Sequence, residues 1–146
     1  MLKKYQHILL AIDLHPSCDK TTGAKAVALA EQFGAKLSVV HAIEHISAYG
    51  IAQAYPTVLD LEEQIVNDAR EELAKLTESW KFKVENQYIE VGPPKTIILA
   101  KAIELKADLI VVGSHGRHGL GLLLGSTANA VLHGAKCDVL AVRVKE

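Results

Sequence analysis

Cysteine, net charge and long apolar runs are all scarce in this 146-residue chain. Its two cysteines, Cys18 and Cys137, fit a reducing compartment better than a disulfide-built scaffold. The formal net charge is -1 without a long acidic or basic block, which argues against a dedicated nucleic-acid-binding protein. No apolar run approaches the roughly 20 residues that span a bilayer. We therefore expect one soluble, cytoplasmic domain over residues 1–146, with no membrane association.

The most informative stretch of the chain, residues 108–134, predicts a strand, a glycine-rich loop and a helix. Residues 109–112 are an unbroken apolar run, typical of a strand buried on both faces of a parallel sheet. Glycines then recur until the loop ends in Ser126 and Thr127, before a helical run over residues 128–133. Free N–H groups and the positive end of the helix dipole would face back toward the loop and favour an anion such as a phosphate.

The remaining segments alternate between the patterns of strands and helices. Strands are predicted at residues 6–14, 36–42, 84–91 and 139–144, and helices at residues 20–33, 58–80 and 95–106. Residues 15–19 predict a turn in which Ser17 or Asp19 caps the next helix, and residues 43–57 predict an irregular stretch. Strands separated by helices indicate an open, Rossmann-like α/β fold, in which helices cover both faces of a five-stranded parallel sheet.

Candidate site residues lie at the carboxyl ends of three of the predicted strands. Asp13, the pair His41 and Ala42, and Gly113 would emerge at the same edge of the sheet. Ligands of such folds bind beyond the carboxyl ends of the strands, so this convergence favours a nucleotide phosphate site. The alternative, that the glycines only turn a tight corner between a strand and a helix, stays open at this point.

The sequence gives less support to metal binding or catalysis. His115 and His118 have a spacing that suits zinc, but no nearby cysteine or acidic residue completes a ligand set. Ser126 lies outside any nucleophile-elbow sequence, and no Walker lysine follows the glycines. We predict a binding protein without a metal site rather than an enzyme, with slow and incidental nucleotide hydrolysis at most.

In their order and spacing, these segments resemble the universal stress protein family, in its short single-domain bacterial A-type form. The resemblance is carried by residues 4–13, 37–42, 91–94, 108–116 and 125–127, and it spans essentially the whole chain. It implies the strand order 3-2-1-4-5, a homodimer and a role in the stress response. It also implies two branches of the family, one that binds ATP and one that does not.

For the nucleoside, the resemblance implies two contacts. Asp13 would hydrogen-bond the ribose, and Ala42 would line the adenine pocket with its backbone and methyl group.

For the phosphates, the resemblance implies that backbone N–H groups and hydroxyls act together. Gly113 and Gly116 would let the triphosphate of ATP, with magnesium, approach the backbone, and Arg117 is an added candidate for neutralising its charge. The three remaining residues, which would grip the phosphates, are Gly125, Ser126 and Thr127.

One feature of the loop departs from the ATP-binding signature of the family. Eight residues, 117–124, separate Gly116 from Gly125, where the signature has nine. The alternative function is therefore a dimeric interaction module of the stress response that takes no nucleotide.

The last predicted strand, residues 139–144, is expected at an edge of the sheet. An open apolar edge strand invites aggregation. Its apolar side chains are Val139, Leu140, Ala141, Val142 and Val144. We predict that this strand pairs antiparallel with the same strand of a second subunit across a two-fold axis, as the resemblance also implies.

Overall fold

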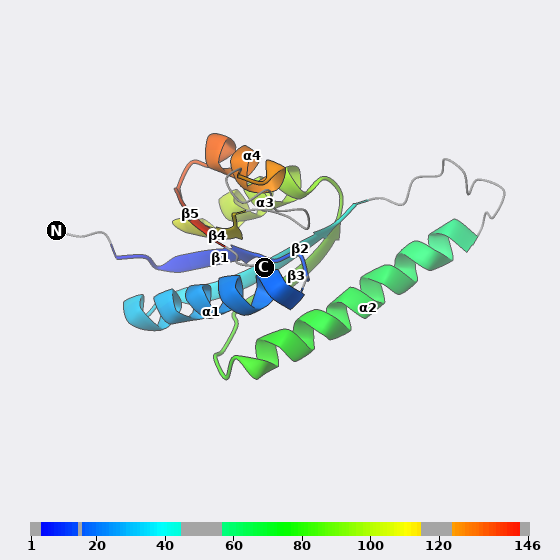
Figure 1. Ribbon diagram of the computed structural model, residues 1–146, viewed down its shortest axis with the longest axis horizontal. Coiled ribbons are helices and arrows are strands. Elements are labelled where there is room, and N and C mark those ends of the chain that lie inside the picture. Colours follow the sequence, from blue (N-terminus) through cyan, green and yellow to red (C-terminus); the bar gives the residue numbers. More distant parts are fainter. Residues whose placement is uncertain (1–3, 15, 45–56, 115–123, 144–146) are drawn as a thin grey trace.

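Strands and helices alternate along residues 4–14, 16–44, 57–114 and 124–143, which this computed structural model describes (Figure 1). The strands are β1 His7–Ala11, β2 Lys36–Ile43, β3 Asn86–Val91, β4 Leu109–Gly113 and β5 Asp138–Val142. The helices are α1 Pro16–Phe33, α2 Thr57–Ser79, α3 Pro94–Glu104 and α4 Ser126–Gly134. The order of elements is the order that the sequence predicts.

The strands form one sheet in the order β3-β2-β1-β4-β5, which confirms the predicted topology. Every neighbouring pair is parallel; β1 lies in the centre, with Leu9 opposite Ser38 on β2 and opposite Ile110 on β4. The carboxyl ends of all strands consequently lie at one edge of the sheet.

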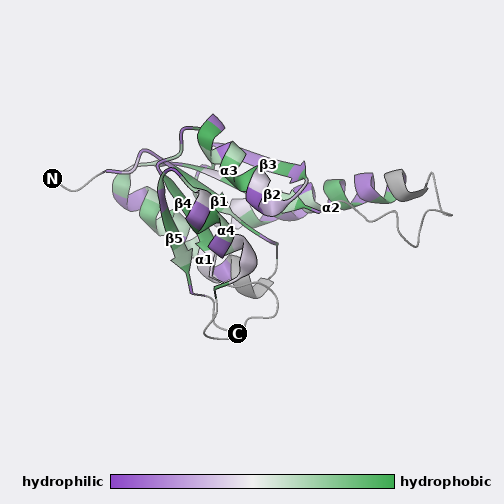
Figure 2. Cartoon of the chain, turned by 90° about the horizontal axis from the view of Figure 1, so that it is seen from above, coloured by the Kyte–Doolittle hydropathy of each residue, from purple (hydrophilic) through white to green (hydrophobic). Residues whose placement is uncertain are grey.

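Two apolar cores lie on the two faces of the sheet. Helices α1 and α2 cover one face and α3 and α4 the other, and apolar residues concentrate in the strands between them (Figures 1 and 2). Successive side chains of a strand point to opposite faces. Ile8 and Leu10 of β1 accordingly belong to the core under α1, whereas Leu9 belongs to the core under α3 and α4. Residues 8–10 of β1 and 109–112 of β4 are all apolar because both faces of these strands are buried.

Helix α1 begins earlier than the sequence predicts. The predicted turn over residues 15–19 and the caps at Ser17 and Asp19 are wrong, because the helix begins at Pro16 and includes both residues. Proline suits the first turn of a helix, where its missing N–H would have no intrahelical acceptor anyway. The other end follows the prediction: Gly34 has a left-handed φ of 64° directly after the last helical residue.

Helix α2 is longer than the strand on which it packs. Its 23 residues span about 35 Å, whereas the six residues of β3 span about 20 Å. The helix therefore extends past the edge of the sheet (Figure 1). Ala69 and Leu73 are buried, whereas Ile65, which recurs at the same four-residue spacing on α2, is 36% exposed. No helix among the described residues has the length and apolar character needed to cross a membrane.

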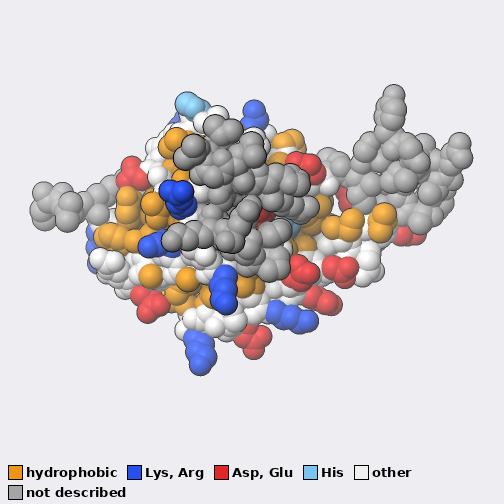
Figure 3. All heavy atoms as spheres, viewed as in Figure 1, with side chains coloured by type: hydrophobic (Ala, Val, Ile, Leu, Met, Phe, Trp, Pro, Cys, Tyr) orange, Lys and Arg blue, Asp and Glu red, His pale blue; other side chains and the backbone are white. Residues whose placement is uncertain are grey.

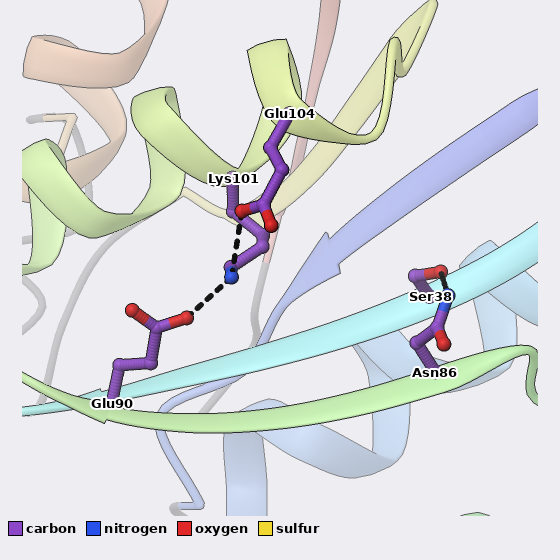
Figure 4. Close-up of polar contacts among 5 residues, drawn as sticks. All are labelled: Ser38, Asn86, Glu90, Lys101 and Glu104. Carbon is purple, nitrogen blue, oxygen red and sulfur yellow. Dashed lines mark hydrogen bonds and ion pairs between the residues drawn. The ribbon is translucent and has the colours of Figure 1, made fainter.

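A buried ammonium group joins α3 to β3. The Lys101 side chain is 10% exposed, and its Nζ pairs with the carboxylates of Glu90 and Glu104 (Figure 4). Nζ also lies 4.1 Å from the centroid of the Tyr88 ring. Burial alone would lower the pKa of Lys101, but the two carboxylates more than offset it and raise that pKa above its ordinary value. Lys101 consequently remains charged in the folded protein.

A second polar group lies within the sheet itself, between β1, β2 and β3. His7 Nε2 lies 2.7 Å from Oγ of the fully buried Ser38, and Asn86 Nδ2 donates to the same Oγ at 3.3 Å (Figure 4). Burial, followed by the charge of Lys36, lowers the pKa of His7. A neutral ring leaves one nitrogen able to accept the Ser38 hydroxyl proton, so the network favours the uncharged form.

The lowered pKa of His7 predicts a pH dependence of stability. As the pH falls, His7 takes up a proton in the unfolded chain near the ordinary histidine pKa of 6.5. In the folded protein it does so only at a lower pH. Stability from His7 is thus present above pH 6.5 and lost as the pH falls through the folded-state pKa. We expect the free energy of unfolding, measured by urea titration, to fall more steeply for the wild type than for His7→Gln between pH 6.5 and about pH 5. Equal slopes would show that His7 titrates alike in both states.

On the face shown in Figure 3, acidic and basic side chains both occur, with apolar side chains between them. The surface drawn there matches the nearly balanced formal charge of the chain.

Candidate functional site

A cavity of about 180 Å³ opens at the carboxyl edge of the sheet. The ends of β1, β2 and β4 contribute to it, together with the beginnings of α3 and α4 and one side chain of α1. Its lining residues are Ala11, Ile12, Asp13, Thr22, Val40, Ala42, Pro94, Ile98, Val112, Gly113, Gly125, Ser126, Thr127 and Ala128.

The strand order explains why the cavity is here. The chain leaves β1 through α1 and returns as β2, which pairs with β1 on one side. It leaves β4 through α4 and returns as β5, which pairs with β4 on the side away from β1. The two connections diverge between the neighbouring strands β1 and β4. Such a switch point leaves a crevice at the carboxyl edge, where open α/β sheets bind their ligands.

Asp13 is held in place by the residue before it and the residue after it. The N–H of Ile12 donates to the Val40 carbonyl at 3.0 Å, and Nδ1 of His41 donates to the Ile12 carbonyl at 2.7 Å. Leu14 then adopts a left-handed φ of 59°, which is costly for a residue with a side chain and turns the chain toward α1. Strain of this kind is tolerated where the surroundings fix the backbone, and it recurs at functional sites.

The two ends of the glycine-rich loop are joined by a hydrogen bond. The Gly125 N–H donates to the Ser114 carbonyl at 2.6 Å, and the Ser114 N–H donates to the Val142 carbonyl of β5 at 2.7 Å. These contacts fix the start of α4 beside the ends of β4 and β5. They also pair the N–H of Gly125 with a carbonyl of the protein, and the phosphate contact expected of Gly125 stays a prediction.

Helix α4 begins at the cavity, where its first N–H groups have no acceptor within the helix. Gly125 is its N-cap and gives no side-chain capping bond, and the N–H of Asn129 makes the first hydrogen bond of the helix, to the Gly125 carbonyl at 2.8 Å. The N–H groups of Ser126, Thr127 and Ala128 precede that bond and have no intrahelical acceptor. All three residues line the cavity. This end of the cavity therefore suits an anionic group.

The other walls of the cavity are apolar and small. Val40 and Ala42 come from β2, Val112 from β4, and Pro94 and Ile98 from α3. Val40, Ile98 and Val112 belong to the core between the sheet and α3 with α4. A planar, weakly polar ring is the kind of group that such walls accept.

The structure brings together most of the site residues that the sequence predicts. Those that line the cavity are Asp13, Ala42, Gly113, Gly125, Ser126 and Thr127. Gly116 and Arg117 lie outside the described residues, as do His115 and His118. Among the described residues, no group of three or more His, Cys, Asp or Glu side chains is placed to hold a metal ion.

Sequence reasoning missed Thr22, which reaches the cavity from α1. The spacing of the sequence could have pointed to it. Thr22, Ala26 and Ala30 are spaced four residues apart and lie on the buried face of α1. Thr22 is the polar member of that series. A hydroxyl in an otherwise apolar helical stripe can therefore point to a site.

Comparisons with known proteins agree on one family. The profile of the universal stress protein family matches residues 4–143. Universal stress protein A homolog 2 of Coxiella burnetii is 44% identical over 144 residues, which cover 99% of each chain.

Two solved structures illustrate the likeness of fold. Universal stress protein UspA from Lactobacillus plantarum has a TM-score of 0.82 at 23% identity, covering 97% of this chain and 100% of that chain. A universal stress protein solved in complex with cAMP has a TM-score of 0.63 at 28% identity, covering 96% of this chain and 98% of that chain.

Proposed function

The chain belongs to the universal stress protein family, and on that premise we propose that its cavity binds ATP or a related adenine nucleotide as a regulatory ligand in the stress response. One observation carries the proposal. The cavity combines small apolar walls, a carboxylate and the uncapped beginning of a helix. These are complementary to the three parts of a nucleotide, namely a planar base, a sugar with hydroxyl groups and an anionic phosphate chain.

The nucleoside would occupy the part of the cavity between β2, α3 and the end of β1. Adenine would lie against Val40, Ala42 and Ile98, where larger side chains on β2 would fill the space. The ribose would donate a hydroxyl proton to the carboxylate of Asp13. A charged acceptor makes such a hydrogen bond stronger than one between neutral partners.

The phosphates would lie at the start of α4. The N–H groups of Ser126, Thr127 and Ala128 would donate to phosphate oxygens, and the hydroxyls of Ser126 and Thr127 could add to them. Gly113, without a side chain, leaves the end of β4 accessible. Magnesium would accompany the phosphates of ATP. The contacts expected from Gly116 and Arg117 stay predictions.

The class of ligand has support from a relative as well as from the cavity. The universal stress protein solved with cAMP, itself an adenine nucleotide, is 28% identical to this chain. We propose a regulatory role for the ligand because the sequence has neither a Walker lysine nor a nucleophile elbow. The cytoplasmic location expected from the sequence also stays a prediction.

Filling the adenine region should weaken nucleotide binding. In isothermal titration calorimetry with ATP and magnesium, we expect saturable micromolar binding by the wild type. Ala42→Leu should weaken it by about tenfold or more, because the added atoms occupy the space of the base. Ala28→Leu makes the same change on the exposed face of α1 and should bind like the wild type.

Thermal unfolding of each variant without ligand separates lost binding from lost folding. Absence of heat and of thermal stabilisation with the folded wild type at millimolar ATP would contradict the proposal. That result would favour the alternative, an interaction module that takes no nucleotide.

We further propose that the chain forms a homodimer through β5. This strand pairs only with β4 among the described strands, so its other edge is open. The Ser114 N–H donates to the Val142 carbonyl, which places the backbone polar groups of Val142 on the β4 side. Since these groups alternate along a strand, those of Ala141 point to the open edge. They are in position to pair with a second copy of β5.

Ala141→Pro tests this edge without removing a bond to β4. Proline lacks the outward N–H and is tolerated at strand edges, and Ala141 is exposed. We expect the wild type to be a dimer at micromolar concentration by light scattering, Ala141→Ser to remain a dimer, and Ala141→Pro to shift toward monomer. A monomeric wild type would overturn the proposed dimer, and a fully dimeric Ala141→Pro would overturn its location at β5.

A further inference from the structure

The side chain of Thr22 is a buried polar group that the fold leaves without a hydrogen bond. Thr22 is 2% exposed, and among the described residues its Oγ1 is the buried side-chain oxygen or nitrogen that has no partner. Most buried hydroxyls in proteins are hydrogen-bonded, because an unpaired one loses its interactions with water and gains nothing in return. Such an exception calls for a physical reason.

A purely structural role does not supply that reason. A threonine within a helix commonly donates its hydroxyl proton to the carbonyl three or four residues earlier, and Oγ1 of Thr22 makes no such bond. Valine would fill the same volume on the buried face without the unpaired oxygen. Thr22 does, however, line the cavity at the carboxyl edge of the sheet.

We propose that the Thr22 hydroxyl is a ligand-binding group that forms a hydrogen bond with the nucleoside part of the bound molecule. This inference rests on the proposed function, since it assigns a further contact in the same cavity. It makes Thr22 a specificity-determining residue: a ligand that presents a hydroxyl or amino group at this position is favoured over one that presents only carbon.

The nucleoside is a better partner for Thr22 than the phosphates. The donors suited to an anion belong to α4, on one face of the sheet, whereas Thr22 comes from α1, which covers the opposite face (Figure 1). The connection from β1 to α1 also carries Asp13, whose carboxylate lines the cavity. A phosphate near that carboxylate would be repelled, whereas a sugar hydroxyl can bond to both an acid and an alcohol.

Three variants test the proposal: Thr22→Val removes the hydroxyl at constant shape, Thr22→Ser keeps it, and Thr21→Val makes the first change at the exposed neighbouring position. Each is titrated with adenosine and with ATP plus magnesium, and each is unfolded by heat without ligand. For Thr22→Val we expect affinity for both ligands to fall about tenfold, because the ligand group loses its partner. The melting temperature without ligand should rise by about 2–5 °C, since the unpaired oxygen is gone.

Thr22→Ser should retain most of the affinity for both ligands, and Thr21→Val should match the wild type in binding. For Thr22→Val, a higher melting temperature without ligand together with a lower affinity for the ligands distinguishes a ligand-binding hydroxyl from a structural one.

The outcomes separate this inference from the function on which it rests. A wild type that binds neither adenosine nor ATP would overturn both. Binding by the wild type with unchanged affinity in Thr22→Val would overturn the inference and leave the proposed function standing. A loss confined to ATP would place the contact at the phosphates and contradict the assignment to the nucleoside.

Discussion

The parallel pairing of a central strand that is buried on both faces is the constraint on which the rest of this structure depends. Ile8, Leu9 and Leu10 are fully buried between two layers of helices, so β1 carries no charged side chain until the chain leaves the sheet at Asp13. Parallel neighbours end at the same edge, which brings Ala42 and Gly113 to the same place. The ligand cavity is therefore a consequence of the topology, and its chemistry is supplied by the residues that follow each strand.

A short chain of backbone hydrogen bonds connects the site to the edge of the sheet. Ser114 donates to Val142 on β5 and accepts from Gly125 at the start of α4. Ser114 thus connects the start of α4, with its proposed phosphate-binding N–H groups, to β5, the strand of the proposed dimer edge. A ligand that draws α4 toward the cavity would act on the same residue that holds β5, which gives a regulatory ligand a direct physical connection to the surface where a second subunit would pair.

The sequence predicts most of the fold, because burial on both faces leaves an apolar pattern that is visible without coordinates. It also predicts that Asp13, Ala42, Gly113 and Ser126 belong together, since parallel strands share an edge. It does not reveal which N–H groups already bond within the protein, as that of Gly125 does with the Ser114 carbonyl. Nor does it show that Ile65 is 36% exposed, because the amphipathic pattern of α2 continues where the helix extends past the sheet (Figure 1). Thr22 could be recognised only once its burial and missing partner were known.

The central claim is that an adenine nucleotide binds at the carboxyl edge of the sheet. Backbone amide NMR of the ¹⁵N-labelled protein, titrated with ATP and magnesium, tests it most directly because it reports where a ligand binds. We predict saturable shifts at Asp13, Ala42, Gly113 and Thr127, with the amides of His7 and Asp138 at the opposite edge unchanged. Shifts confined to that opposite edge, or none at millimolar ATP, would contradict it.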